Sequence, residues 1–584
     1  MILQNLLQPD KQICSDESMF YHVSDGTYFF DTYFNAFSLE KWKTYTTVKD
    51  IQLHLSCVSP VHIEVHDESG ILSSTDINMP QAESVDIPVE YGETSRFIYI
   101  TVRNIDDSSV MPIKSGYFYT KDAPEQEVSL ALDICTYKRE EFVYHNIGVL
   151  KDAILTNPES PLHDKIHVFI SDNGQTLDAA RLEDEHIHVY PNMNAGGTGG
   201  FTRGILEIQK KKEELHLTHM IFMDDDIVLN PDALVRTYGL LSFARDQYKQ
   251  SSVAGAMLRL DRRYTLHEVA ANWAGGDPIV TNQGMDLRAF AHVMKNEELR
   301  QGDYAAWWYA CYPLSVVRED NMPIPFFLHM DDVEYGLRNR NGVMTLNGIN
   351  VWHSVFENKR ASSLSYYDIR NIMLTNAVYF QDGNLRFMKR YIFKRFMANT
   401  LRFRYKDVNM TYMAVRDFCR GPEYLKNLNP QEKNRELMDS GYKMLPIDTL
   451  TTDENLKNEI RNYQKPENIS DVYQKYTVKN KWKYQITVNG WLLPSQRDKV
   501  YAYPMGIHPY ALFRKKNVIL FDPDSQTGIA VHKSWRELMG VLCTIGRTYL
   551  LIATQYRKAQ QEYRREIQTM QTAGFWRKYL KLDA

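Results

Sequence analysis

The stretch Met220-Ile-Phe-Met-Asp-Asp-Asp-Ile-Val-Leu229 decides the fold, because an apolar run ends abruptly in three carboxylates and then becomes apolar again. The flanks are typical of a buried strand, which places Asp224, Asp225 and Asp226 at a strand end, where open α/β sheets bind ligands. Three adjacent acids repel one another unless a cation lies among them. Oxygen ligands of this kind suit Mg²⁺ or Mn²⁺ holding a diphosphate. A solvated acidic turn is the alternative.

Apolar runs alternate with amphipathic stretches from Val128 onward, and this alternation predicts a doubly wound, mostly parallel sheet. The predicted strands are residues 128–136, 166–171, 187–190 and 220–223. Thr136, Asp172 and Asp224 each follow such a strand. Because the carboxyl ends of parallel strands meet at one edge of a sheet, these side chains are expected to lie close together.

The segments on either side of this core have different patterns. Residues 1–127 alternate apolar and polar positions with turn residues between them, which predicts an antiparallel β-sandwich. Its aromatic cluster at 28–34 is either a sugar-stacking platform or ordinary core. Residues 386–584 are predicted to form a mainly helical domain, although residues 479–524 have no assigned role. The chain therefore divides into 1–127, the α/β core at 128–385, and 386–584.

Bulk composition excludes several classes of protein. The 584 residues are 43% hydrophobic and 24% charged, an ordinary globular composition. A net charge of -5 argues against a nucleic-acid partner. Six scattered cysteines indicate neither a disulfide framework nor a zinc site, which favours a reducing cytoplasm. No signal peptide and no uniformly apolar run of about 18 residues are present, so membrane contact is expected to be peripheral only.

Other motifs can carry chemistry, and each has a structural alternative. The glycine-rich run 194–204 lets the backbone approach a ligand, but a flexible turn needs the same residues. Trp307 and Trp308 suit a sugar face or a core. Asp331 and Asp332 precede an apparent helix, whose N-terminus favours acids in any case. His353 ends a short strand, where a lone histidine is more often structural than a ligand.

In this order and spacing, the motifs resemble those of the inverting GT-A glycosyltransferases of family two. More narrowly, they are similar to the polymerising galactofuranosyltransferases of mycobacterial arabinogalactan synthesis. The likeness covers about residues 130–375 and rests on Thr136 to Arg139, Ser171 to Asn173, Asn194 to Phe201, Met223 to Ile227, His267 to Val269, Trp307-Trp308, Asp331 to Arg338 and Val351 to His353. It implies a Rossmann-like GT-A core between the β-sandwich and the helical domain.

The resemblance also implies a role for each matching residue. Asp224, Asp226 and His353 would hold Mn²⁺ or Mg²⁺, with Asp225 near the donor sugar or ribose. Arg139, Asp172 and Asn173 would line the uridine site beside Thr136 and Asn194. Asp332 would be the catalytic base. Glu268, Asp331, Trp307 and Trp308 would position the acceptor and donor sugars.

One position departs from the family pattern. A second histidine that contacts the donor phosphates in the family has no counterpart in Tyr366-Tyr-Asp-Ile-Arg-Asn371. That contact is expected to be lost or taken over by Tyr367 or Arg370, because a carboxylate such as Asp368 is unfavourable beside a diphosphate.

The resemblance predicts transfer of galactofuranose from UDP-galactofuranose to a growing bacterial cell-surface glycan. The same machinery could use another donor, such as glucose, galactopyranose or rhamnose, since fold and motifs fix the reaction better than the sugar. A non-catalytic glycan-binding protein is the alternative from another class. The expected partners are a UDP-sugar and a lipid-linked glycan acceptor on the inner face of the plasma membrane. Basic, aromatic helices near 386–406 and 535–582 suit peripheral membrane contact or a homo-oligomer.

Overall fold

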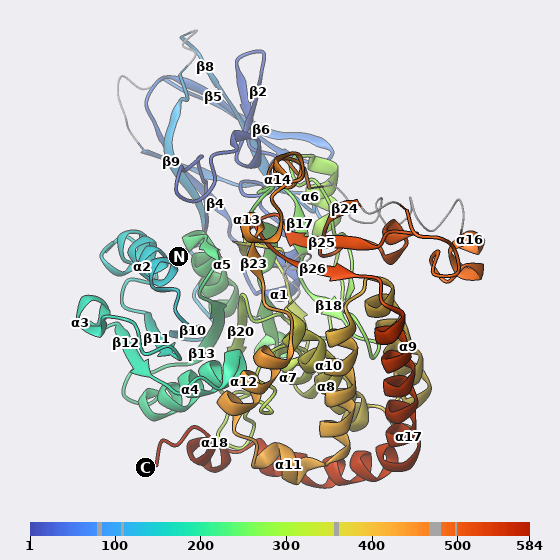
Figure 1. Cartoon of the computed structure of the whole chain (residues 1–584). Coiled ribbons are helices and arrows are strands. Elements are labelled where there is room, and N and C mark those ends of the chain that lie inside the picture. The colour runs from blue at the N-terminus through green and yellow to red at the C-terminus, as the bar shows by residue number, and fades with distance from the viewer. Residues whose placement is uncertain (79–83, 107–109, 356–360, 466–480, 497–498, 584) are drawn as a thin grey trace.

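A computed structural model describes residues 1–78, 84–106, 110–355, 361–465, 481–496 and 499–583. The N-terminal sheets stand at the top of Figure 1, the α/β core lies below them, and the C-terminal helices and a small sheet cover one side of that core. Within the predicted segment 479–524, residues 479, 480, 497 and 498 lie outside the described residues.

The N-terminal segment forms two antiparallel sheets, as predicted. One has the strand order β1-β9-β4-β7 and the other β2-β3-β8-β5-β6. Their bounds are β1 Ile2–Asn5, β2 His22–Ser24, β3 Thr27–Phe29, β4 Gln52–Cys57, β5 Val61–Asp67, β6 Gly70–Ile77, β7 Ser84–Pro88, β8 Tyr99–Asn104 and β9 Ile113–Tyr119, with helix α1 at Leu39–Tyr45. Phe30, Tyr33 and Phe34 are buried. The aromatic cluster at 28–34 therefore contributes to the core.

A seven-stranded mixed sheet forms the centre of the molecule, in the order β12-β11-β10-β13-β20-β15-β21. The four predicted strands are present and mutually parallel: β10 Leu130–Thr136, β11 Ile166–Asp172, β12 Ile187–Pro191 and β13 His219–Asp224. Strand β20 (Ala310–Pro313) runs antiparallel to β13 and to β15 (Ser252–Ala254), and β21 (Val343–Met344) completes the sheet. Apolar side chains fill β13 up to Asp224, which explains its central position.

A second, four-stranded sheet lies against the carboxyl ends of the first. Its order is β14-β22-β16-β17, with β14 at Val228–Leu229, β22 at Asn350–His353, β16 at Ala256–Arg259 and β17 at Leu266–Glu268. A short hairpin, β18 (Ala271–Asn272) and β19 (Ile279–Val280), follows. Because β14 continues the chain directly after the three acids and pairs with β22, the sheet brings His353 toward them.

The helices of the core are α2 Glu140–Leu150, α3 Ala179–Leu182, α4 Gly196–Lys211, α5 Pro231–Ser242, α6 Phe290–Asn296, α7 Asp331–Arg338 and α8 Ser362–Tyr379. The C-terminal helices are α9 Leu385–Leu401, α10 Tyr405–Cys419, α11 Pro422–Lys426, α12 Pro430–Ser440, α13 Ile447–Leu450, α14 Glu454–Arg461, α16 Lys481–Ile486, α17 Trp535–Glu566 and α18 Ala573–Tyr579. Long helices α8, α10 and α17 pack against one another, which confirms the helical C-terminal region.

The C-terminal region also contains a sheet that composition did not reveal. Its order is β23-β26-β25-β24, with β23 at Leu445–Pro446, β24 at Val500–Pro504, β25 at Asn517–Asp522 and β26 at Thr527–His532. Two strand-like patterns occur in this part of the sequence, at 484–488 and at 517–521. The second forms β25, whereas the strand expected at 484–488 is wrong, because α16 covers 481–486. Short apolar patterns do not distinguish a strand from a helix.

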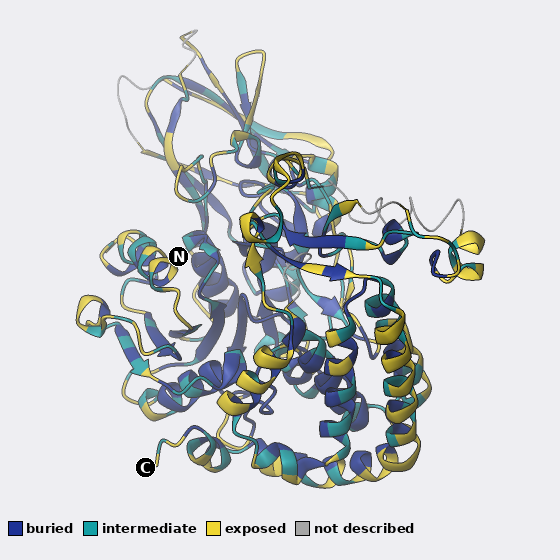
Figure 2. Ribbon diagram, in the orientation of Figure 1, coloured by how far each residue is buried: buried dark blue, intermediate teal, exposed yellow. Residues whose placement is uncertain are grey.

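Burial differs sharply among the C-terminal helices. Trp576 of α18 is fully buried and its Nε1 donates to Pro323 O at 2.8 Å, so this part of the aromatic tail packs on the core. By contrast, α17 and α9 expose a yellow outer face in Figure 2. By length and composition, Trp535–Met570 could cross a membrane, although the sequence predicted no such helix; 17% of its apolar window is buried. The core helix of a soluble protein can meet the same criteria.

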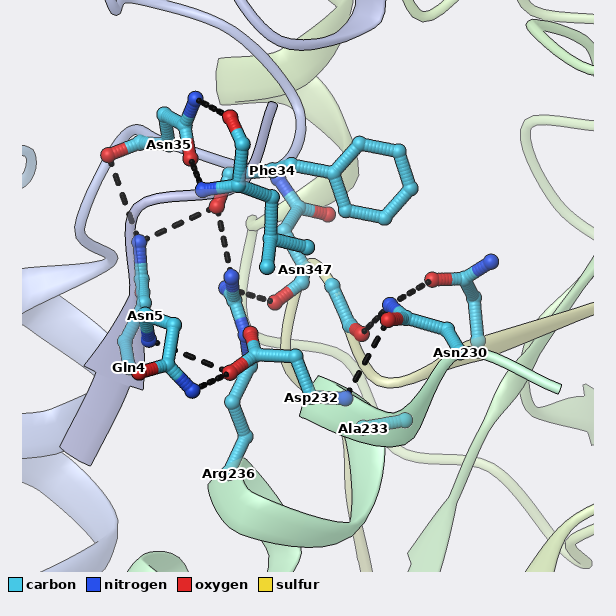
Figure 3. A network of polar contacts seen from close by, with 12 residues as sticks. Gln4, Asn5, Phe34, Asn35, Asn230, Asp232, Ala233, Arg236 and Asn347 are labelled. Carbon is cyan, nitrogen blue, oxygen red and sulfur yellow. Dashed lines mark hydrogen bonds and ion pairs between the residues drawn. The ribbon is translucent and has the colours of Figure 1, made fainter. Parts of the chain in front are cut away.

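A buried polar network joins the N-terminal segment to the α/β core (Figure 3). Arg236 of α5 pairs with Asp232 at 2.5 Å and donates to Phe34 O at 2.6 Å and Asn347 O at 2.9 Å. Asp232 in turn accepts from the Asn5 amide at 2.7 Å. A buried guanidinium is stable only when such partners surround it. The network therefore fixes β1 and the 34–35 turn against α5.

Candidate functional site

The three consecutive acids lie at the end of β13, as predicted, and His353 comes from the neighbouring sheet. The ligand atoms of Asp224, Asp226 and His353 all lie within 4.8 Å of one another. Nε2 of His353 is 3.0 Å from Oδ1 of Asp226. Two carboxylates and an imidazole at this spacing could hold a divalent ion, and the imidazole suits Mn²⁺ better than Mg²⁺.

Asp225, the middle acid, is held by residues at and just after the end of β10. Thr136 at the end of β10 donates to Asp225 Oδ2 at 2.7 Å, and Arg139 donates to Asp225 Oδ1 at 2.9 Å. Arg139 also pairs with Asp226 at 2.8 Å. Asn146 of α2 donates to the carbonyl oxygens of Asp225 and Ile227 and so fixes the turn that follows β13. The structure thus brings Thr136 and Arg139 together with all three acids.

Electrostatics favour a cation at this position. The pKa of Asp224 is raised to about 7, chiefly by burial; the charge of His353 opposes the rise, the carboxylates of Asp226 and Asp225 add to it, and Arg139 also opposes it. Burial also raises the pKa of Asp225. Carboxylates resist ionisation in such a crowded place, and a divalent ion among them would remove that penalty. The donor atoms and their charge therefore fit a metal ion.

The predicted nucleotide-binding residues on β11 and the loop after β12 shape this edge of the sheet. Asp172 accepts hydrogen bonds from the backbone N–H groups of residues 174, 176 and 177. Asn173 donates to Gly196 O at 2.9 Å, and Asn194 accepts from Gly196 N at 3.0 Å. Contact of these three residues with a nucleotide remains a prediction. The observed bonds show that they hold the loops around the start of α4.

The glycine-rich run forms the first turns of α4 rather than a loop. Gly196 has φ +76°, and a Cβ there would lie 2.0 Å from Phe327 O. A Cβ on Gly200 would lie 2.0 Å from the sulfur of Cys135 on β10. These glycines therefore let the helix approach β10 and the 327–330 loop closely. From the sequence alone, a glycine needed for such packing looks the same as a glycine that makes room for a ligand.

The loop before the second acid pair is strained and is held by side chains of α8, above all Asn371. Phe327, His329 and Met330 all have positive φ, at 76°, 63° and 71°. Such conformations are costly for residues with a Cβ and persist where the surroundings hold them. Nδ2 of Asn371 donates to Phe326 O, Leu328 O and His329 O at 3.3, 2.7 and 2.9 Å. Asn371 therefore fixes the loop that carries Asp331 and Asp332.

The second acid pair lies at the N-terminus of α7, beside the start of α4. Thr198 donates to Asp331 Oδ2 at 2.6 Å, and Asp332 accepts from Val333 N at 2.7 Å. Burial raises the pKa of Asp332 well above its usual value, and the charges of Asp331 and Glu268 raise it further. Cys135 of β10 is close enough to both acid clusters to respond to them: burial raises the pKa of its thiol, and the charges of Asp225, Asp133, Asp224 and Asp331 raise it further.

Glu268 and the tryptophan pair have different environments. Burial raises the pKa of Glu268 at the end of β17 to about 7, and Tyr304 donates to its carboxylate at 3.3 Å. Trp307 stacks on Phe222 with ring centroids 4.2 Å apart, which favours the core alternative for this residue. Trp308 is 9% exposed and donates to Gly255 O at 3.0 Å. Sugar contact by Glu268 and Trp308 remains a prediction.

The family's second histidine position is occupied by residues with other partners. Asp368 accepts a hydrogen bond from Nδ1 of His329 at 2.7 Å. Although burial lowers it, this bond raises the pKa of His329 to about 9. Arg370 is buried and donates to Phe326 O at 2.5 Å, and Tyr367 stacks on Phe327. Arg370 and Tyr367 thus support the 326–330 loop. His329 and Asn371 were missed because their partners are distant in sequence.

A cavity of about 540 Å³ opens beside the acids. On the core side it is lined by Arg139, Asn173, Asn194, Asp224, Asp225 and Phe327. Its volume falls within the range of small-molecule sites, and it reaches the strand end where α/β sheets bind ligands. Five of the predicted site residues therefore share one cavity.

Comparisons with known proteins identify distant relatives. No family model matches the chain. The galactofuranosyltransferase GlfT2 of Mycolicibacterium smegmatis is 25% identical over 432 residues, covering 68% of this chain and 64% of the relative. GlfT2 of Mycobacterium tuberculosis is 25% identical over 442 residues, covering 68% and 66%. The matches thus span less than two thirds of either relative.

Among solved structures, the mannosyltransferase PcManGT of Pyrobaculum calidifontis, in complex with GDP-Man and Mn²⁺, shares 10% identity over 55% of this chain and 88% of its own. The TM-score of 0.27 is too low for this likeness to carry an argument. The chain is therefore distantly similar in sequence to galactofuranosyltransferases, and its mixed sheet agrees with the GT-A core expected from its motifs.

We expect the variant His353→Ala to bind Mn²⁺ at least about tenfold more weakly than the unaltered protein, because it loses one of the three side chains that would bind the ion directly. Isothermal titration calorimetry with Mn²⁺ measures this directly. His54→Ala, which removes a half-buried histidine of β4 in the N-terminal sheet, is the matched control. An unchanged Mn²⁺ affinity in His353→Ala would contradict the ligand assignment.

Proposed function

We propose that this protein is a metal-dependent, inverting glycosyltransferase that transfers a sugar from a nucleotide donor to a glycan acceptor. The observation that carries the proposal is the presence of two acid clusters whose neighbouring side chains differ. Asp224 and Asp226 meet a histidine at one strand end, while Asp332 lies in the first turn of α7 and accepts a hydrogen bond from Val333 N. Transfer from a nucleotide sugar needs both a charge-neutralising site and a separate base.

The donor side rests on the triad and Arg139. When bound, a divalent cation supplies neutralisation of the negative charge that builds on the departing diphosphate. Arg139 adds a fixed positive charge beside Asp225 and Asp226. Asp225, held by Thr136 and Arg139, has its carboxylate fixed where it can accept a hydroxyl hydrogen bond from the ribose or the donor sugar.

The acceptor side rests on Asp332. Its raised pKa makes it a stronger proton acceptor than an ordinary aspartate, which suits removal of a proton from an acceptor hydroxyl. The hydroxyl oxygen would then form the new glycosidic bond as the bond to the diphosphate breaks, and the proton would pass to Asp332. A base on the face opposite the leaving group gives inversion. Asn371 and the strained 327–330 loop would hold that carboxylate in position.

The donor sugar proposed is galactofuranose, carried by UDP, with a bacterial cell-surface glycan as the acceptor. The distant similarity to two galactofuranosyltransferases supports this choice. A panel of UDP-galactofuranose, UDP-galactopyranose, UDP-glucose and deoxythymidine-linked rhamnose, assayed for nucleotide release with a galactofuranosyl acceptor, tests it. Release with UDP-galactofuranose alone is the expected result. Preference for another donor would replace the sugar and keep the mechanism, whereas no release with any donor would contradict the proposal.

We expect Asp332→Asn to lower kcat by about 10² to 10⁴-fold, because the amide cannot accept the acceptor's proton. Affinity for UDP and Mn²⁺ should stay within about twofold, since the carboxylate serves only proton transfer. Steady-state kinetics and calorimetry measure the two effects. Asp320→Asn removes an exposed aspartate in the 318–321 turn and is the matched control. Retained turnover in Asp332→Asn would exclude Asp332 as the base.

The pH dependence of the reaction should follow from the same carboxylate. Because the pKa of Asp332 is raised, its basic form is lost as pH falls through a value well above the usual 3.9 of aspartate. The acid limb of kcat/KM should therefore lie well above the pKa of an ordinary aspartate, and activity should rise as pH increases through it. A profile that stays flat down to about pH 4 would contradict a raised pKa for the base.

We also propose that the exposed faces of α9 and α17 contact an anionic membrane that carries the acceptor. Tyr549 of α17 donates to Lys389 O at 2.6 Å, so the two helices lie side by side. Their exposed apolar residues are Phe393, Trp535, Met539, Leu542 and Leu550, and the exposed cations of α9 are Arg386, Arg390 and Lys394. Apolar side chains beside cations are typical of interfacial helices.

Sedimentation with phosphatidylglycerol vesicles tests this contact. We expect the unaltered protein to sediment with these vesicles and less with phosphatidylcholine vesicles, because the cations need anionic lipid. The variant L542E/L550E should lose most of the binding, while I71E/V110E, at exposed apolar sites of the N-terminal segment, should keep it. Equal binding by both variants would exclude this surface.

A further inference from the structure

The cavity beside the acids has a second wall that comes from the C-terminal region. Asn434 and Met438 of α12, Met444, and the turn residues Asp522, Ser525 and Thr527 between β25 and β26 all line it. More than 200 residues of chain separate this wall from the end of β13. The sequence motifs of the α/β core, including the acids and the glycine-rich run, did not reveal this second wall.

The turn that forms this wall is rigidly built. Asp522 accepts from Asp524 N at 3.2 Å and from the Ser525 hydroxyl at 2.8 Å, and the Ser525 and Thr527 hydroxyls lie 2.7 Å apart. Strand pairing fixes its ends, because Asp522 faces Thr527 in the β25–β26 ladder. A turn already ordered before binding loses little entropy when a ligand arrives.

An ion-pair chain ties the turn to the α/β core. Lys465 pairs with Asp524 of the turn at 2.5 Å and lies 3.5 Å from Asp261, which Arg259 of β16 holds at 2.9 Å. Arg262 donates to Lys465 O at 2.8 Å. Strand β16 pairs with β22, which ends at His353. The second wall is therefore anchored to the same sheet that delivers the metal-binding histidine.

The two walls differ in charge. Among the described residues that line the cavity, Arg139 is the cation, and it lies on the core wall beside the acids. The C-terminal wall offers a carboxylate, two hydroxyls and an amide, together with the methionines. A diphosphate next to Asp522 would be repelled by its carboxylate. Ribose hydroxyls and base N–H groups, by contrast, can donate hydrogen bonds to the oxygen atoms of this wall. Methionine side chains adapt to the flat apolar face of a base.

We propose that the C-terminal wall, defined as Asn434, Met438, Met444, Asp522, Ser525 and Thr527, binds the nucleoside part of the donor. The inference rests on the proposed function, because the donor is taken to be a nucleoside diphosphate sugar. The diphosphate lies toward Arg139 and the triad, and the base and ribose lie between the two walls. The C-terminal region thus contributes to donor recognition.

Calorimetry with UDP and with inorganic pyrophosphate, each in the presence of Mn²⁺, tests the proposal on the full chain. The variant S525A/T527V removes two hydroxyls, so its affinity for UDP should fall about tenfold. Met438→Ala, which leaves the turn intact, should weaken the binding of UDP about threefold or more, because it removes apolar contact with the base. Affinity for pyrophosphate should be unchanged in both. S74A/T75V, an exposed pair on β6, is the matched control and should bind UDP normally.

The outcomes separate this inference from the proposed function. Unaltered protein that binds neither UDP nor pyrophosphate would contradict the proposed function itself. Unaltered protein that binds UDP, together with variants that bind it equally well, would overturn only the role of the C-terminal wall. Equal losses for UDP and pyrophosphate would also overturn it, because they would show a general disturbance of the site rather than loss of nucleoside contact.

Discussion

The crowding of carboxylates at the end of β13 is the constraint on which the rest of the site depends. Three consecutive acids at a buried strand end cannot all ionise without compensation. The protein supplies part of that compensation through Arg139 and Thr136, which hold Asp225, and through His353, which approaches Asp226 from the second sheet. The raised pKa of Asp224, about 7, shows that the compensation is incomplete. A divalent cation would complete it, and the two sheets are arranged so that its ligands converge.

The second acid pair is positioned by a different device. Asp331 and Asp332 follow a loop in which three residues with side chains adopt left-handed conformations. Asn371, through three hydrogen bonds to carbonyl oxygens, stabilises this loop from α8. The start of α4 touches both sides, since Asn173 binds Gly196 O and Thr198 binds Asp331. The start of one helix is thus bonded both to the loop after β11 and to Asp331, the neighbour of the proposed base.

Local patterns predicted the features that depend on neighbouring residues. Apolar runs predicted β10 to β13, and the abrupt acids at 224–226 placed a site at a strand end. The glycine-rich run was interpreted less accurately, because close packing of α4 on β10 and close approach to a ligand both require the absence of a Cβ. Trp307 shows the same ambiguity: its stacking on Phe222 depends on tertiary contacts that its own sequence neighbourhood does not specify. The C-terminal wall of the cavity could not be predicted, because it forms only when α12 and the β25–β26 turn pack over the core.

The proposed mechanism depends on a metal ion that Asp224, Asp226 and His353 hold beneath a nucleoside diphosphate. Crystals of the protein soaked with Mn²⁺ and UDP, with anomalous diffraction recorded near the manganese edge, test it most directly. We predict an anomalous peak bonded to the two carboxylates and the imidazole, with the UDP diphosphate beside it and Arg139. A manganese peak elsewhere, or UDP bound away from the end of β13, would contradict it.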